Sequence, residues 1–223
     1  MTRLARAVVV LAALASSGAA EAPPGVTVLA PGYFDLEYAA PKPGSYALPP
    51  LRIAADGAVL DDAGRPHHLY DYLGDRVVVL SFIYTTCSDV NGCPLASFVL
   101  KRVQDLALTR PNVRDRLRLV SVSFDPAHDT PPVIAEYGSH LRAPNFDWTF
   151  LTTASDRALQ PLLDRYDQAV FRDENGALSH ILRVMLIDRE KRVRNIYSVS
   201  FLHPDTVLSD VETLLMETPN PRD

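Results

Sequence analysis

Short apolar runs alternate along this chain with longer stretches in which apolar residues recur at helical spacing. The run over residues 76–83 is short and almost wholly apolar, as expected of a buried strand. It is followed by a stretch whose apolar residues share one helical face: Leu95, Phe98, Val99, Val103 and Leu106. We therefore predict a strand leading into a helix over residues 94–109, the start of a strand–helix–strand unit.

The same pattern predicts the elements that follow. After a break at Pro111 and Asn112, we expect a series of strand, helix, strand and helix over residues 117–124, 129–141, 148–151 and 156–166. The last third differs, because two apolar segments joined by a polar turn predict a hairpin, which a closing helix follows: 182–187, 193–199 and 205–216. An earlier turn signal at residues 61–64 predicts another hairpin. Together these elements predict an α/β sandwich with a central mixed sheet flanked by helices.

Residues 1–20 have the composition of a signal peptide. Arg3 and Arg6 precede an apolar run over residues 7–15, and small residues then continue to Ala20, after which we expect cleavage. The run is shorter than the roughly 18 residues of a membrane span, so we expect no stable membrane anchor after leader cleavage. The alternative is an ordinary N-terminal core helix. A leader of this kind predicts export, to a bacterial periplasm or another exported space.

The sequence after residue 20 predicts one domain with an extended segment before it and a short tail after it. Seven prolines between residues 21 and 50 predict an extended segment, with one candidate strand at Tyr33–Tyr38. We divide the chain into the leader, a proline-rich segment, a single domain and a C-terminal tail: residues 1–20, 21–44, 45–217 and 218–223. The 223 residues are 47% hydrophobic, which suits one sizeable core. A net charge of -5 without a basic stripe argues against nucleic-acid binding.

The two cysteines carry the most distinctive chemistry of the sequence. Cys87 and Cys93 are the only ones, and they lie in the loop between the first predicted strand and its helix. A helix N-terminus stabilises thiolates, which are both redox nucleophiles and ligands for soft metals such as Cu(I). In an exported protein a disulfide is the alternative, although closing so short a loop stabilises the fold by only about 2 kcal/mol. The spacing alone does not choose among disulfide exchange, metal binding and a structural disulfide.

Six histidines supply candidates for a third ligand. His180 is the best placed, just before the strand that opens the last hairpin, although its position also fits an ordinary surface histidine. His67 and His68 are adjacent in a predicted hairpin and point to opposite faces, so we interpret them as part of a solvated face. The others are expected in a surface turn or at helix ends: His128, His140 and His203.

Four further side chains have simpler structural interpretations than ligation. Met185 lies in a core-like strand and Met216 on the last helix, so we predict that both are packing residues. Asp125 and Asp129 are a candidate paired-carboxylate site, but helix capping and turn formation explain them more simply.

The order of these motifs resembles the SCO/SenC family of thioredoxin-like copper proteins. The resemblance rests on Phe82-Ile83-Tyr84-Thr85-Thr86-Cys87, Cys93-Pro94, Ser121-Val122-Ser123-Phe124-Asp125-Pro126 with Asp129-Thr130, and Ser179-His180 before Leu186-Ile187-Asp188. It implies a thioredoxin-like fold with an inserted hairpin, and a copper site formed by Cys87, Cys93 and His180. It also implies a role in assembling the dinuclear copper centre of cytochrome c oxidase. Some members of the family are similar to thiol-disulfide reductases that act on the cysteines of that centre.

Two features depart from the family pattern. Five residues separate the cysteines, where the family usually has three. Many members also keep a transmembrane anchor, whereas we expect this chain to lose its leader. Our interpretation is an exported protein that binds copper, as Cu(I) or Cu(II), and delivers it to a client such as a cytochrome c oxidase subunit. The alternative is a thiol-disulfide oxidoreductase in which Cys87 and Cys93 are catalytic. A thiol-disulfide reductant would then be a partner that keeps these cysteines reduced. A peroxidase of the peroxiredoxin type is a third reading, but its usual reactive loop is not evident.

Overall fold

The computed structural model describes residues 33–174 and 178–217. The predicted leader and the predicted C-terminal tail lie outside the described residues, as do residues 21–32 of the predicted proline-rich segment. Within the described ranges, no helix combines the length and the apolar character that crossing a bilayer requires.

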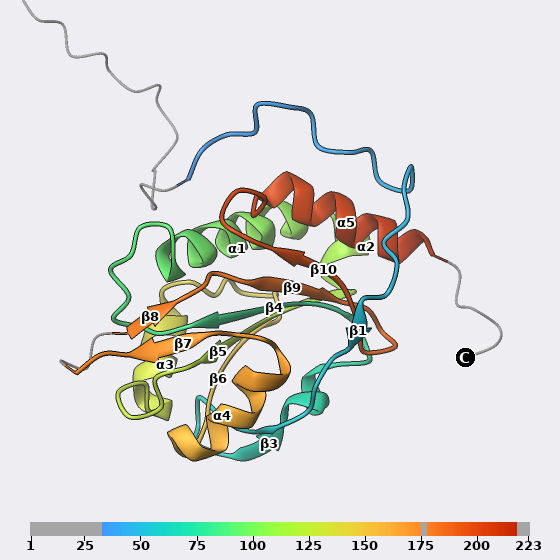
Figure 1. Cartoon of the computed structure of the whole chain (residues 1–223). Coiled ribbons are helices and arrows are strands. Elements are labelled where there is room, and N and C mark those ends of the chain that lie inside the picture. The colour runs from blue at the N-terminus through green and yellow to red at the C-terminus, as the bar shows by residue number, and fades with distance from the viewer. Residues whose placement is uncertain (1–32, 175–177, 218–223) are drawn as a thin grey trace, which may run out of the picture.

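A mixed sheet of eight strands forms the centre of the molecule (Figure 1). Its middle holds three parallel strands, β4 (Val77–Ile83), β5 (Leu117–Ser123) and β6 (Trp148–Thr152). All seven residues of β4 are buried, as expected where helices cover both faces of a parallel sheet. The strand order is β1-β10-β9-β4-β5-β6-β2-β3, and the five outer strands pair antiparallel: β1 (Arg52–Ile53), β2 (Ala58–Asp61), β3 (Pro66–His68), β9 (Val184–Ile187) and β10 (Arg192–Tyr197).

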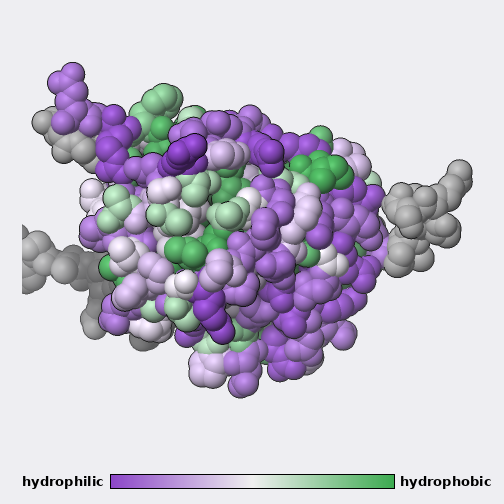
Figure 2. Space-filling model, turned by 90° about the horizontal axis from the view of Figure 1, so that it is seen from below, coloured by the Kyte–Doolittle hydropathy of each residue, from purple (hydrophilic) through white to green (hydrophobic). Residues whose placement is uncertain are grey.

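Helices cover the two faces of the sheet. In Figure 1, α1 (Cys93–Leu108) and α5 (Pro204–Met216) lie above the sheet, and α3 (Pro131–Ser139) and α4 (Asp156–Arg165) lie below it. Two short helical turns, η1 (Leu69–Tyr72) and α2 (Pro111–Arg114), complete the layers. The underside is mostly hydrophilic, with hydrophobic patches that are small and separate (Figure 2). The predicted α/β sandwich with a mixed sheet between helices is confirmed.

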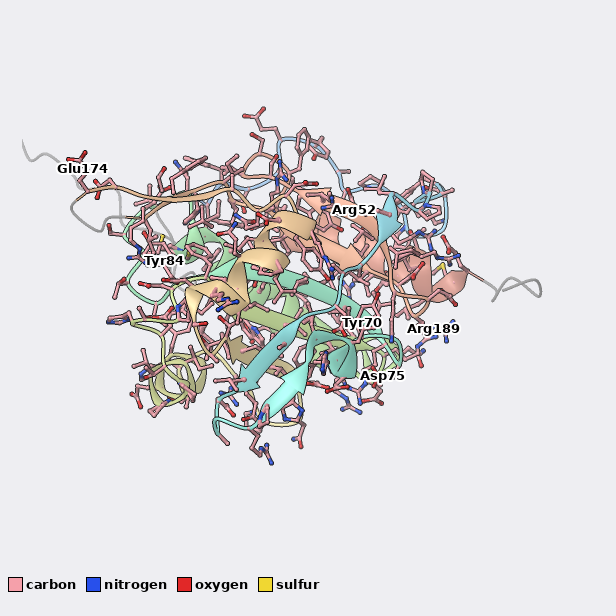
Figure 3. The ribbon with its side chains drawn as sticks, turned by 60° about the horizontal axis from the view of Figure 1, so that its bottom comes forward. Arg52, Tyr70, Asp75, Tyr84, Glu174 and Arg189 are labelled. Atoms are coloured by element: carbon pink, nitrogen blue, oxygen red, sulfur yellow. The ribbon has the colours of Figure 1, made fainter. Side chains whose placement is uncertain are left out.

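A second, two-stranded sheet is formed by the segment that lies between α4 and β9 in the sequence. It pairs β7 (Val170–Arg172) with β8 (Leu178–His180). This hairpin extends beyond the body of the molecule, with Glu174 near its tip (Figure 3). It is the inserted hairpin implied by the family resemblance, and it places its last residue, His180, beside the loop that follows β4.

The N-terminal strap, defined here as residues 33–51, crosses over α1 and α5 (Figure 1). The predicted strand at Tyr33–Tyr38 is wrong, because this part of the strap pairs with no strand among the described residues. Side-chain contacts fix the strap instead. The Tyr33 hydroxyl is 2.8 Å from Nε2 of His203, and the Gly44 N–H donates to Oγ1 of Thr213 at 3.0 Å. The closing helix therefore fixes the first part of the strap, and the end of the strap is bound to the sheet, because the Leu51 N–H donates to the carbonyl of Val193 in β10 at 2.8 Å.

The two predicted hairpins are confirmed. The β2–β3 turn is closed by Asp61, whose carboxylate accepts the N–H groups of Ala63 and Arg65 at 3.0 and 2.8 Å. The β9–β10 turn repeats this arrangement with Asp188. The backbone hydrogen bonds explain why each hairpin turns at an aspartate.

Candidate metal centre

The cysteine loop, residues 84–92, carries the chain from the end of β4 to the start of α1. A turn begins where the Cys87 N–H donates to the carbonyl of Tyr84 at 3.3 Å. A second turn forms around Asp89, which accepts the N–H of Gly92 on its carbonyl at 2.9 Å and the N–H of Asn91 on its carboxylate at 3.1 Å. Gly92 is then the N-cap, and Cys93 is the first residue of α1.

Three donor atoms from two distant segments meet at this loop. Nε2 of His180 lies 3.5 Å from Sγ of Cys87 and 3.5 Å from Sγ of Cys93. The three ligand atoms all lie within 4.8 Å of one another, and both cysteines are free thiols. In residues 33–174 and 178–217 this is the one group of three or more such side chains with metal-ligating geometry. The structure thus brings together the three residues that the sequence singled out.

The His180 ring is held by aromatic packing. Its centroid lies 5.0 Å from that of Phe124 and 5.6 Å from that of Tyr84, both edge-on. Tyr84 lies close to the base of the β7–β8 hairpin (Figure 3), and its hydroxyl is 3.4 Å from the carbonyl of Leu178. Nδ1 of His180 is buried and has no hydrogen-bond partner within the described part of the chain. Packing therefore orients this imidazole, where metal-binding histidines usually rely on a second hydrogen bond.

The backbone of Gly92 closes one side of the centre. A Cβ atom at this position would lie 2.9 Å from Cε1 of His180 and 3.2 Å from Sγ of Cys87. These separations are shorter than ordinary van der Waals contact. Glycine is thus required here because the main chain approaches the ring and the sulfur too closely for a side chain.

The two thiols differ in exposure and in acidity. Cys87 is partly exposed, whereas Cys93 is buried. The hydrogen bond from the Cys93 thiol, helped by His180, lowers the pKa of Cys87 against the effect of burial. The same hydrogen bond and burial raise the pKa of Cys93. Burial also raises the pKa of Tyr84, as does its proximity to Cys87. The accessible sulfur, Cys87, is therefore the first to become a thiolate.

Asp129 anchors the start of the cysteine loop. Its carboxylate is fully buried and accepts the N–H of Thr85 at 3.0 Å, together with hydroxyl groups of Thr85 and Ser123. His128 Nδ1 lies 2.8 Å from the same carboxylate. Asp125 instead pairs with Arg172 of the β7–β8 hairpin at 2.8 Å. The two aspartates therefore have separate structural partners, and the helix-capping role preferred for them is wrong, because the N-cap of α3 is Thr130 and the helix begins without a side-chain cap.

The anchoring role of Asp129 was not predicted. The sequence held one signal for it, a polar residue at or just beyond the end of each of two strands. Thr85 lies two residues after β4, and Ser123 is the last residue of β5. Parallel neighbours bring these strand ends to one edge of the sheet, so a buried acceptor between them was a reasonable expectation.

The remaining histidines lie away from the thiols. His67 lies 3.4 Å from Asp61, and His68 lies 3.0 Å from Asp56. His140 ends α3 and His203 caps α5, as predicted for helix ends. Met185 is fully buried, as predicted. The packing role predicted for Met216 is wrong, because this side chain is 63% exposed at the end of α5.

Comparisons with known proteins place this arrangement in context. The family model described as SCO1/SenC matches residues 50–216. A search of curated proteins finds no match. Among solved structures, the chain is similar to a SCO1/SenC family lipoprotein from Bacillus anthracis str. Ames, with 23% identity and a TM-score of 0.66, over 76% of this chain and 99% of that one.

Two further structures share the fold. One is yeast Sco1 with copper bound, with 19% identity and a TM-score of 0.62, over 75% of this chain and 91% of that one. The other is BsSco, described as a member of the Sco family of cytochrome c oxidase assembly proteins with a disulfide switch. It has 21% identity and a TM-score of 0.63, over 77% of this chain and 99% of that one. These likenesses establish the fold, and the thioredoxin-like prediction is confirmed.

Proposed function

The chain belongs to the SCO1/SenC family, and from that premise we propose that it is an exported protein that binds copper and delivers it to a copper centre such as that of cytochrome c oxidase. The observation that carries the proposal is the meeting of Nε2 of His180 with both sulfurs at 3.5 Å. The copper-bound yeast Sco1 and the assembly role stated for BsSco support it.

The donor set suits copper. Two thiolates are soft ligands that favour Cu(I), and an imidazole also accommodates Cu(II). Atoms that share one ion at bond lengths of about 2.0–2.3 Å lie about 3–4.5 Å apart. The separations between Nε2 of His180 and the two sulfurs fall in this range. Copper is cargo in this proposal, so the protein must hold it and also release it.

The residues around the centre favour both the binding of copper and its release. Tyr84 and Phe124 keep the imidazole facing the sulfurs, and Gly92 excludes any side chain from the side it closes. Cys87 is the more exposed sulfur, so an incoming client ligand meets it first. Transfer then proceeds by ligand exchange, in which a client cysteine replaces the protein's donors one at a time.

Anaerobic copper titration of the reduced protein tests the assignment. We expect one copper per chain in the wild type, and an affinity at least about tenfold lower in Cys87→Ser, Cys93→Ser and His180→Ala, because each variant removes one donor. His67→Ala is the matched control, since its ring lies beside Asp61 and not beside the sulfurs. Unchanged stoichiometry and affinity in all three ligand variants would refute the proposal.

Thiol-disulfide exchange is the second candidate, favoured by the pairing of an exposed and a buried thiol. The Cys87 thiolate attacks a client disulfide, and one client sulfur leaves as a thiolate and takes up a proton. Cys93 then attacks Cys87, which frees the second client thiol and leaves a Cys87–Cys93 disulfide. An external dithiol supplies the two electrons that reopen it. Cys93→Ser is expected to retain the mixed disulfide on a non-reducing gel; failure to exchange with any thiol partner would exclude this role.

Export rests on the composition of residues 1–20. We expect the mature protein to begin at Glu21 and to occur in the exported fraction of the cell. N-terminal sequencing measures this, and an intact chain starting at Met1 inside the cell would contradict it.

A further inference from the structure

A groove of about 450 Å³ lies beside the cysteine loop. One wall is residues 33–38 of the N-terminal strap. The other is the loop before α5, through Val199, Ser200, Leu202 and His203. Asn91 and Leu95 line it as well, so the groove reaches to within two residues of Cys93. We propose that this groove docks a protein segment that carries lysine or arginine next to an aromatic or aliphatic side chain. This proposal rests on the proposed function, because the docked segment belongs to the client of the copper centre.

The floor of the groove is fixed in place. Tyr33 packs edge-on against Phe98 of α1, with ring centroids 4.6 Å apart, and stacks on His203 at 5.5 Å. Its hydroxyl is hydrogen-bonded to Nε2 of the same histidine. Leu95 and Leu202 are buried beneath. A partner therefore meets a preformed surface and loses little free energy in ordering it.

The rim of the groove exposes large apolar side chains. Phe34 is 79% exposed and Tyr38 is 52% exposed, both on the strap, and Val199 faces them from the opposite wall at 40%. Tyr33 already fills the inward position of the strap, so its neighbour Phe34 points to solvent. Exposed aromatic residues gathered around a concave surface are typical of sites that bind a protein segment.

Charge specifies the chemistry of the occupant. Asp35 and Glu37 line the groove, and none of the described residues that line it is a lysine or an arginine. Asp205 adds a negative charge at the start of α5, 3.9 Å from the His203 ring. Arg102 acts on Tyr33 and His203 with the opposite sign, against the fields of both Asp35 and Asp205. An acidic groove with an apolar rim complements a basic segment with an aromatic or aliphatic anchor, and repels an acidic one.

The groove lies beside the copper centre, so a client segment bound in it would be close to the site from which copper is transferred. Asn91 belongs both to the groove and to the turn that leads to Cys93. Leu95 belongs both to the groove and to the first turn of α1. A segment bound here keeps its own cysteine or copper ligand within reach of the exposed Cys87 sulfur, which raises the effective concentration of the acceptor at the centre.

Fluorescence anisotropy with short synthetic peptides tests the proposal on the reduced protein. The probe peptide contains lysine and phenylalanine, and two matched peptides carry glutamate for lysine or serine for phenylalanine. We expect the first peptide to bind at least about tenfold more tightly than either of the others. We expect Phe34→Ser and Tyr38→Ser to remove the phenylalanine preference, and Asp35→Asn with Glu37→Gln to remove the lysine preference.

Ile53→Ser is the matched control, because Ile53 is also exposed but lies on β1, outside the groove. The groove variants should keep the copper affinity of the wild type, so copper titration separates failure of docking from failure of the copper centre. Equal binding of the three peptides, or binding that the groove variants do not alter, would overturn the proposal. So would a dimer in sedimentation that Phe34→Ser dissociates, because the groove would then belong to a second copy.

Discussion

Gly92→Ala is the sharpest single test of the copper centre. The added Cβ would lie 2.9 Å from Cε1 of His180, and 3.2 Å from both Nε2 of that ring and Sγ of Cys87. Favourable contacts between carbon atoms begin near 3.5 Å, so the ring must withdraw by about 0.5–1 Å. Tyr84 and Phe124 pack against the same ring and resist that movement.

The size of the effect follows from this confinement. Overpacking of a filled site costs about 1–3 kcal/mol, and each 1.4 kcal/mol corresponds to about a tenfold change in affinity. We therefore expect Gly92→Ala to lower copper affinity by about 10–100-fold, mainly by displacing the imidazole. Both sulfurs remain, so the variant should still bind copper with a weaker or absent nitrogen ligand.

Competition titration with a copper chelator measures the affinity, and X-ray absorption reports the nitrogen ligand separately from the two sulfurs. Asn91→Ala is the matched control, because Asn91 is adjacent and exposed, and its loop contact to Asp89 is made by the backbone. A thermal melt checks that both variants fold. Wild-type affinity with full copper–nitrogen scattering in Gly92→Ala would refute the inferred close approach.

Two further predictions concern Asp129, which anchors the cysteine loop, and His203, which caps α5. Asp129→Asn places amide hydrogens where Thr85 now donates, so we expect about 1–3 kcal/mol less stability in urea denaturation and faster exchange of the Thr85 amide; unchanged protection there would contradict the anchoring role. The pKa of His203 is lowered, chiefly by burial and also by Arg102, against the opposing fields of Asp205 and Asp35. The unfolded chain then binds more protons, so stability should be complete above about pH 6.5 and fall as the pH drops below it. His203→Asn should flatten that profile, and an equal acid loss in the variant would refute the assignment.

The fold was largely predictable because its central elements carry strong local patterns. β4 is an almost wholly apolar run, and α1 has a clear apolar face, so the pattern of apolar residues in the sequence is enough to identify both. The β7–β8 hairpin was not predicted from the residues, because strands of three residues with exposed positions carry no readable periodicity. In the strap, only the strand expected at Tyr33–Tyr38 was wrong. Its Tyr33 side chain binds the cap of α5, and no strand pairs with residues 33–38 in the described part of the chain.

The candidate site was predictable only where the chemistry is local. Cys87 and Cys93 are visible as a pair in one loop, but His180 stands 87 or more residues away, and the resemblance to a family singled it out. The contact between Gly92 and the His180 ring depends on how two segments pack. Such contacts arise from the tertiary structure and leave no periodic trace in the sequence.

The structure also explains how a loop with five residues between the cysteines keeps a compact centre. The turn around Asp89 folds the chain back, through hydrogen bonds from the N–H groups of Asn91 and Gly92. Cys93 thereby remains the first residue of α1, and the two sulfurs stay within 4.8 Å of each other. The same turn brings the Gly92 backbone against the His180 ring, where a Cβ atom would lie 2.9 Å from Cε1.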